Sequence, residues 1–492
     1  TIKLDGNYPV GTGNVALGNT ALDSVEAGGT YNVAIGDAAG TAITTGDGNV
    51  GVGADALLLN SSGGYNTALG TSSVRNNTTG NYSVGLGQGA LYSNTTASYG
   101  TAVGFRAAYS NTTGADNTAM GGNSLYTNST GNFNVASGYA SLRLNTTGSS
   151  NVGLGYESLK SNTTASSNTA VGYQAGYSNT TGAENVLVGY KAGYSSTTGN
   201  GLTAVGRQAL EDNTASNNTA LGFAVMSNNT TGGFNTALGG ANYGFTGGAM
   251  HNNTTGSYNT ALGNQALHGN TTASECTAVG YQAGHTGNAE QGTFIGKDSG
   301  KLVTGVKNTF VGAGSGNSVT SGTRNTILGR YNGNQGGFDC RTRSNHIVLS
   351  DGDGNPRLQI DDDGNIKVPQ VTSNTTGNSA NMHITSSGEF AKSTSSLRYK
   401  NTVTVATHGL TELLTLRPVT YKGNNDGDTV FGGLIAEEVH DAGLTEFVMY
   451  NDDGEPDALA YSNMVSLCIK AIQEQQATIT ALTDRITALE GA

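Results

Sequence analysis

A serine and a lysine near the C-terminal end of the sequence have the types and spacing to carry chemistry. Ser395 lies five residues before Lys400. A serine hydroxyl is a weak nucleophile until a base takes its proton, and a lysine can be that base when burial lowers its pKa. Spacing alone favours a simpler interpretation, in which Ser395 belongs to a Ser-rich linker and Lys400 is a solvated side chain.

Three motifs around this pair favour the chemical interpretation. They are Ser-Ser-Leu-Arg-Tyr-Lys at 395–400, Leu-Arg-Pro-Val-Thr-Tyr-Lys at 416–422 and Gly-Leu-Ile-Ala-Glu-Glu-Val at 433–439. In this order, residues 393–492 resemble the C-terminal intramolecular chaperone domain of phage endosialidases and tail fibres, peptidase family S74. The resemblance implies that Ser395 and Lys400 form a dyad that cleaves its own chain once, after assembly. Ser396 stands where the family usually has Asp, which is a departure from the family pattern next to the expected nucleophile.

The last helix of the sequence carries a heptad pattern. Within the chaperone-like region, 393–464 is the expected chaperone domain and 465–492 the helix. Apolar residues fill most of its two core positions, which are Val465, Ile472, Ile479 and Ile486 at a, and Cys468, Gln475, Leu482 and Leu489 at d. This pattern predicts an intermolecular coiled coil, with packing on the helix's own domain as the alternative. The resemblance implies that the coil is trimeric.

Upstream, residues 10–330 repeat a phrase of the type Asn-Thr-Ala-Val-Gly, whose closing glycine recurs at a nearly constant interval of 17 residues. Counting back from that glycine, position −1 is aliphatic almost everywhere, with Ser137 as the polar exception, and position −3 is Val or Thr. The two positions share parity, so both point to one face of a strand. We expect that face to be the interior, and the small position −2, as in Ala34 and Ala119, to face another backbone. The fold class predicted is mainly β, a β-roll or β-solenoid shaft, and the repeats resemble the head β-roll of YadA-like trimeric adhesins.

Composition limits the function classes. The chain has 492 residues with 76 glycines and only 12% charged residues, so its length indicates an extended array rather than several cores. One coil buries few apolar side chains, which predicts a homotrimer. The net charge of −12 excludes a nucleic-acid partner, and without an apolar run near 20 residues we expect no membrane insertion. The cysteines form no CxxC pair, so we expect no metal site and no cofactor.

Four further features have two interpretations each. The 24-residue interval from Gly239 to Gly263, with Tyr243, Phe245, Met250 and His251, is a contact loop or, as we favour, a surface bulge. Residues 331–392 read as a β-meander and distal tip, where the acidic run 351–355 is a hairpin turn rather than a calcium loop.

The Asn-Thr-Thr sequons follow from the repeat, so we expect turns rather than glycans. The tyrosines could bind sugars, but we favour interchain packing; those considered are Tyr156, Tyr173, Tyr177, Tyr190 and Tyr194.

Together these features predict a trimeric viral tail fibre or spike that adheres to a host surface and is part of the virion. Its expected partners are two further copies of itself, a host receptor of the glycan class, and other virion tail proteins. We expect residues 1–9 to be a truncated N-terminal lead-in that a virion-docking domain would precede. One alternative is a glycan-degrading tailspike, which needs two placed carboxylates. The isolated acids Asp116, Glu157, Glu184 and Glu211 form no obvious pair. The other alternative is a cell-surface trimeric adhesin, against which the lack of a membrane anchor counts.

Overall fold

The structure is a computed structural model that describes residues 11–241, 247–369, 382–384, 390–392, 400–424, 427–451 and 453–491. The chain divides into two compact units, Thr1–Thr375 and Thr376–Ala492. Among the described residues, no helix combines the length and the apolar character that a membrane crossing requires.

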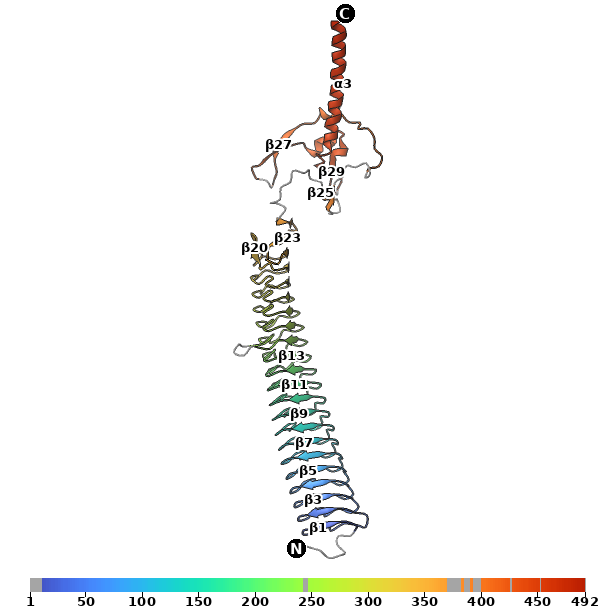
Figure 1. The fold of residues 1–492 in the computed structure, drawn as a ribbon, viewed down its shortest axis with the longest axis vertical. Helices are drawn as coiled ribbons and strands as arrows, with labels where there is room; N and C mark the ends of the chain where they lie inside the picture. Colours follow the sequence, from blue (N-terminus) through green and yellow to red (C-terminus); the bar gives the residue numbers. More distant parts are fainter. Residues whose placement is uncertain are drawn as a thin grey trace. The chain divides into compact units, whose positions relative to one another are not determined.

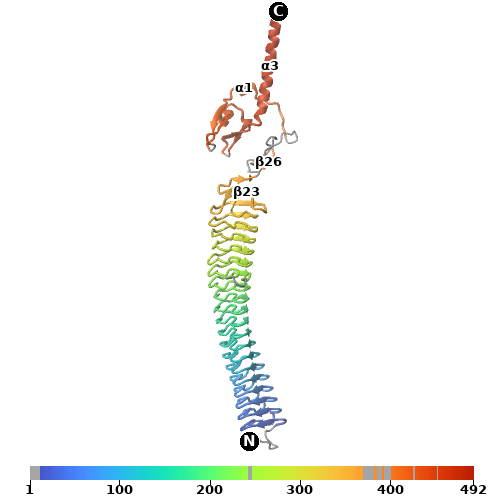
Figure 2. The ribbon, with the colours of Figure 1, turned by 60° about the vertical axis from the view of Figure 1, so that its left-hand side comes forward.

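The first unit is a parallel β-solenoid, hereafter the shaft, in which each coil contributes one three-residue strand (Figures 1 and 2). Successive strands pair in register, so that Thr67 lies opposite Val84 and Leu69 opposite Leu86. The β-solenoid with a 17-residue repeat, predicted from the sequence, is therefore confirmed. The strands are β1 (Val15–Leu17), β2 (Val33–Ile35), β3 (Val50–Val52), β4 (Thr67–Leu69), β5 (Val84–Leu86), β6 (Thr101–Val103), β7 (Thr118–Met120), β8 (Val135–Ser137), β9 (Val152–Leu154), β10 (Thr169–Val171), β11 (Val186–Val188), β12 (Thr203–Val205), β13 (Thr219–Leu221), β14 (Thr236–Leu238), β15 (Thr260–Leu262), β16 (Thr277–Val279), β17 (Thr293–Ile295), β18 (Thr309–Val311) and β19 (Thr326–Leu328).

The closing glycine is required by the geometry of the stack. Gly87 has a φ of +131°, which L-residues rarely adopt, and a Cβ there would lie 2.5 Å from the carbonyl oxygen of Gly104 in the next coil. Asparagine ladders hold the turns. The Asn94 amide donates to the Ala97 carbonyl at 3.0 Å and to Asn77 Oδ1 of the preceding coil at 2.9 Å. Because this amide is buried, the Asn-Thr-Thr phrase serves as a structural turn.

The interior of the coil is the opposite face from the one we predicted. Position −2 is buried, as Ala68 and Phe310 show with no exposed surface, whereas Leu69 at position −1 is 50% exposed. We call the surface formed by positions −1 and −3 of β1 to β19 the outer β-face. The prediction was wrong because the coil is narrow: where the second segment supplies a leucine, the strand has room for only a small side chain, and where the strand supplies a large one, as at Phe294, the neighbouring second segments have glycine.

Large and small residues alternate between the strand and the second segment of the coil. Eight second segments supply a buried leucine four residues after the closing glycine, such as Leu159. At β17 the strand instead supplies Phe294, and the second-segment positions on either side of it are Gly284 and Gly300. A Cβ at either glycine would lie within 3 Å of the Phe294 ring, so the two positions share one fixed volume.

The shaft sheet continues past residue 330. β22 (Ile347–Ser350) pairs with β19 in parallel, and β23 (Pro356–Ile360) and β24 (Ile366–Lys367) then add in antiparallel fashion. β20 (Asn334–Gln335) and β21 (Phe338–Asp339) form a separate hairpin.

The second unit is α+β. Its strands form antiparallel pairs, which are β25 (Met382–Ile384) with β26 (Phe390–Lys392), β27 (Val419–Lys422) with β28 (Val430–Gly433), and β29 (Val448–Tyr450) with β30 (Pro456–Leu459). Its helices are α1 (Leu410–Leu413), α2 (Ala436–Asp441), the 3-10 turn η3 (Thr445–Phe447) and α3 (Met464–Glu490). A small core formed by Val439, Phe447 and Leu467 joins α2, η3 and the start of α3.

Candidate functional site

The structure describes only one of the two residues of the predicted dyad. Ser395 and Arg398 lie outside the described residues, and Lys400 is exposed at the start of the next described segment. The dyad therefore stays a prediction, and its support rests on the motifs downstream.

Two of those downstream motifs meet in space. Arg417, which precedes β27, forms a bidentate ion pair with Glu438 on α2, with 3.2 Å between Arg417 Nε and Glu438 Oε2. Hydrogen bonding to Arg417 lowers the pKa of Glu438, and the same contact raises that of Arg417. Tyr461 also accepts a hydrogen bond from the Leu434 N–H at 2.7 Å. These contacts make 416–422 and 433–439 parts of one folded body.

An apolar hollow of about 430 Å³ lies at the base of α3. Its lining combines the motif segments with the first heptad positions of the helix, and comprises Leu413, Leu416, Pro418, Leu434, Tyr461, Met464, Val465 and Cys468. Val465 and Cys468 are also the first residues of the α3 seam, which we define as the eight a and d positions from Val465 to Leu489. The seam is exposed in the single chain, with Ile472 63% and Ile486 54% accessible. The hollow thus opens onto an unpartnered apolar stripe.

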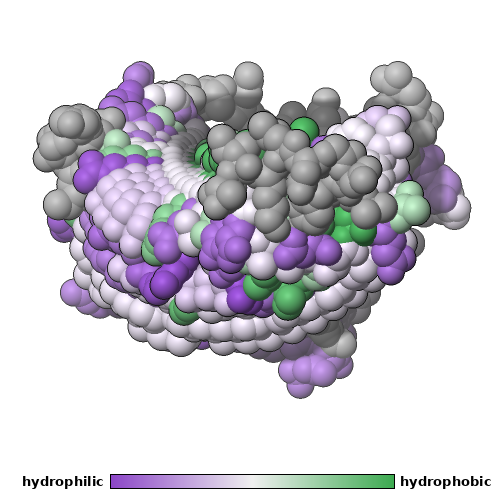
Figure 3. Space-filling view, turned by 90° about the horizontal axis from the view of Figure 1, so that it is seen from below, coloured by the Kyte–Doolittle hydropathy of each residue, from purple (hydrophilic) through white to green (hydrophobic). Residues whose placement is uncertain are grey.

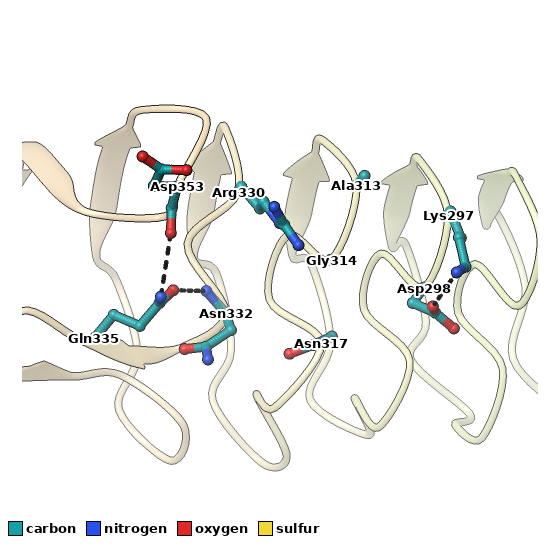
Figure 4. A pocket seen from close by; sticks show the side chains of 9 residues that line it. All are labelled: Lys297, Asp298, Ala313, Gly314, Asn317, Arg330, Asn332, Gln335 and Asp353. Atoms are coloured by element: carbon teal, nitrogen blue, oxygen red, sulfur yellow. Dashed lines mark hydrogen bonds and ion pairs between the residues drawn. The ribbon is translucent and has the colours of Figure 1, made fainter.

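A second hollow, of about 370 Å³, lies at the C-terminal end of the shaft and is polar (Figure 4). We call it the terminal groove. It is lined by Lys297, Asp298, Ala313, Gly314, Asn317, Arg330, Asn332, Gln335 and Asp353. These residues follow strands β17, β18 and β19 and the turn between β22 and β23, so stacked coils bring them together.

Charges in the terminal groove are unequally paired. The Lys301 ammonium lies 3.4 Å from Asp298 Oδ1, and that of Lys297 lies 3.8 Å from Asp298 Oδ2. Within the described part of the chain, no ion pair or side-chain hydrogen bond joins the Arg330 guanidinium to another group. Sequence reasoning missed this groove because its parts are 56 residues apart, from 297 to 353. The available signal was the small pair Ala313 and Gly314 between Lys297 and Arg330 in the column of residues that follow the closing glycines.

The tyrosines considered as sugar platforms stack on one another within the chain. Tyr156 lies between Tyr139 and Tyr173, with ring centroids 5.6 Å and 5.4 Å away, and Tyr177 stacks on Tyr194 at 5.1 Å. A ring such as Tyr156 therefore has both faces covered by neighbouring coils. Only its edge is open, which does not suit the face-on stacking that sugars use.

The isolated acid Glu157 also has a structural role. Its carboxylate accepts hydrogen bonds from Lys160 at 2.7 Å and Gln174 at 2.9 Å. Burial by itself would raise the pKa of Glu157, but these two donors outweigh that effect and lower it. An ionised, fully engaged carboxylate is a poor general acid, so Glu157 does not support glycan hydrolysis.

The acidic run 351–355 has a structural role. Asp351 accepts the Asn355 N–H at 2.9 Å and pairs with Arg357, and these contacts lower its pKa to about 2. This is the expected hairpin turn. The next turn brings carboxylate oxygens of Asp361, Asp362 and Asp363 within 4.8 Å of one another, but Asp361 is held by the Asn365 N–H at 2.8 Å in the same manner.

In the 24-residue interval, one residue lies in the shaft core and another contacts a neighbouring coil. Met250, assigned to the loop by the sequence, is fully buried in the core, and His251 stacks on His268 at 5.6 Å. Tyr243 and Phe245 lie outside the described residues. Burial raises the pKa of the Cys340 thiol to about 11, and likewise raises that of Cys276, so neither is a reactive thiolate near neutral pH.

A scan of protein-family models finds no match to the chain, and searches of curated proteins and of solved structures find none either.

Proposed function

We propose that this chain is the shaft subunit of a homotrimeric viral tail fibre or spike that adheres to a host cell surface. The observation that carries the proposal is the combination of a long in-register solenoid with a terminal helix whose apolar seam is exposed. A stack of coils is stiff along its axis, as a connector between virion and cell must be. Its partners are two further copies, a surface glycan and other tail proteins.

Assembly needs a surface that recognises a second copy. The α3 seam supplies one, since isoleucines at three successive a positions prefer contact with another helix to contact with water. The outer β-face supplies another, with Leu69 and Met120 about half exposed. The row of aliphatic side chains at position −1, beside the threonines and valines of position −3, is a long exposed surface of the kind that marks an interface. We therefore place the contact between shafts on the outer β-face and not, as the sequence suggested, on position −2.

The rest of the visible shaft surface is weakly polar. Viewed from its N-terminal end in Figure 3, residues of intermediate hydropathy cover most of it, and strongly hydrophilic residues occur in small separate groups. Such a surface favours packing between copies over binding to a highly charged polymer. Self-cleavage at Ser395 and Lys400 would follow assembly and make it irreversible.

Intact mass and native mass test this proposal together. We would compare the unmutated chain with Ser395→Ala, and with Ser393→Ala as a matched control for loss of a nearby hydroxyl. The expected result is release of a C-terminal fragment from the unmutated chain and the control but not from Ser395→Ala, with three chains in every product. Equal fragments in all three would refute the dyad. A monomer would refute the assembly, and a dimer, which Ile at a with Leu at d favours when the seam acts alone, would refute the trimer.

A further inference from the structure

The terminal groove lies where two small residues stand between two cations in the column of residues that directly follow the closing glycines. In the middle of the shaft this column carries aromatic residues, such as Tyr156, Tyr173 and Tyr190, which stack from coil to coil. Towards the C-terminal end the same column reads Tyr281, Lys297, Ala313, Arg330. Ala313 and the adjoining Gly314 leave the hollow between the two cations (Figure 4).

The side chains around this hollow are mainly hydrogen-bond donors. Arg330 reaches along the shaft toward Gly314 (Figure 4). The carbonyl oxygens of two amides are already used, since Asn317 Oδ1 accepts from Ser318 at 3.0 Å and Asn332 Oδ1 accepts from the Asn334 N–H at 2.8 Å. Their NH₂ groups are what these amides have left to offer a ligand.

One wall of the groove is held in place from both sides. Gln335 Oε1 accepts the Asn332 N–H at 3.2 Å, and Gln335 Nε2 donates to the Asp353 carbonyl at 3.4 Å. This links the β20 segment to the turn after β22. A side chain fixed in this way loses little conformational entropy when a ligand binds.

The charges select among anions. Arg330 suits a carboxylate, which a guanidinium binds through two parallel hydrogen bonds. Asp298 and Asp353 also line the groove, and they would repel a ligand with several negative charges while accepting hydrogen bonds from hydroxyl groups. A ligand with one carboxylate and many hydroxyls meets both conditions, and a volume of about 370 Å³ holds roughly one or two sugar rings.

We propose that the terminal groove binds a saccharide bearing a single carboxylate, an inference that rests on the proposed adhesion function. Arg330 holds the carboxylate, Asn317 and Asn332 donate to ring or hydroxyl oxygens, and Asp353 accepts from a hydroxyl. The site is complete within one shaft.

The test is binding of the full chain to oligosaccharides ending in one glucuronate or galacturonate, beside the methyl ester of each. The ester keeps the shape and removes the charge. We expect the acid to bind at least about tenfold more tightly than its ester, and Arg330→Gln to abolish that difference. Arg324→Gln, an exposed arginine outside the lining, is the matched control and keeps the affinity.

A second variant removes the cavity instead of the charge. Ala313→Tyr restores the residue that other coils carry at this position, so the fold accepts it, and it fills the hollow. We expect loss of binding with an unchanged melting temperature. The inference is overturned if no acid binds more tightly than its ester, or if Arg330→Gln and Ala313→Tyr bind as well as the unmutated chain.

Host-cell binding and native mass, measured on the same samples, separate this inference from the proposed function. Sugar binding without cell binding or trimerisation contradicts the fibre proposal alone. A trimer that adheres to cells equally well with and without Arg330→Gln contradicts the groove alone.

Discussion

In the shaft, apolar side chains such as Leu91 and Phe310 are covered by neighbouring coils of the same chain, whereas in the C-terminal unit α3 leaves Ile472 63% exposed. The shaft interior is complete in one copy, because every coil receives the same contacts from the coil before and the coil after. In the described part of the chain, Ala471 is the last buried residue of α3, and the apolar seam residues beyond it are exposed. The comparison teaches that folding of the shaft core is a property of one chain, while the seam needs another chain.

The largest effect is expected at a closing glycine within the shaft. Gly172 has a φ of +133°, and a Cβ there would meet the Gly189 carbonyl oxygen at 2.5 Å. Gly172→Val should therefore destabilise the adjoining coils by about 4 kcal/mol or more, with loss of the cooperative melting transition in circular dichroism. Gly352→Ala is the control, since its added Cβ meets nothing within 4 Å. Equal melting curves for both variants would show that backbone closure does not depend on glycine.

A core truncation should come next. Phe294→Ala empties the volume that Gly284 and Gly300 leave to the ring, so we expect a loss of about 3–5 kcal/mol. The double variant Phe294→Ala with Gly300→Ala adds one methyl group to the same volume and should restore only a small part of the loss, since a methyl group is much smaller than the phenylalanine ring; the fold accepts alanine there, because Ala108 has a φ of +50° at the equivalent position. Urea unfolding of the two variants measures both changes. If the native mass falls as well, the variant assembles less than the unmutated chain. The shaft interior would then depend on assembly, which contradicts the contrast between the shaft core and the α3 seam.

Charges introduced on the α3 seam should weaken association and leave the stability of the shaft unchanged, the reverse of what the core truncation should do. Ile472→Asp with Ile479→Asp places carboxylates in the expected interface, so association should weaken on the order of 100-fold or more while shaft melting stays unchanged. Thr480→Asp with Thr483→Asp, also exposed on α3 but outside the seam, should keep the native mass. Sedimentation of the intact chains over a concentration series gives the result. Unchanged association in the seam variant would mean that the outer β-face is sufficient to assemble the chains.

The sequence predicted the strand period and the terminal helix because each depends on residues close together in the chain. The helix expected from residue 465 begins at Met464. The parity of the strands was wrong, since aliphatic residues at −1 and −3 fit an interior as well as an exposed interface, and only width decides between them. The exchange of Phe294 against Gly284 and Gly300 could have decided it, because a phenylalanine flanked by compensating glycines must be inside.

The candidate sites were less accessible to sequence reasoning. The terminal groove depends on three coils and a turn stacked in register, and on two absent side chains at Ala313 and Gly314. Neither the stacking of these coils nor the gap at the two small residues can be recognised before the register of the coils is known. The pairing of Arg417 with Glu438, by contrast, lies within the motifs that the sequence already singled out. Ser395 and Lys400 remain a prediction from those motifs.

The smallest expected effect concerns His285, a buried histidine of the shaft. His285 Nδ1 is buried and has no hydrogen-bond partner in the part of the chain that the structure describes, and its ring stacks on His268 at 5.2 Å. Burial, then His268 and Lys301, lower the pKa of His285, with Asp298 acting weakly in the other direction. A histidine whose folded pKa lies below its unfolded value leaves stability unaffected at high pH. It destabilises the fold as pH falls through the unfolded value of about 6.5, because the unfolded chain then binds the extra proton. The melting temperature should therefore fall more between pH 7.5 and 5.5 for the unmutated chain than for His285→Gln, by a few degrees at most.

His440→Gln, in the C-terminal unit, is the control, and its melting temperature should fall with pH as much as that of the unmutated chain. A larger fall in His285→Gln than in the unmutated chain would mean that protonation of this ladder stabilises the shaft, and that its charge is balanced by groups such as Asp298.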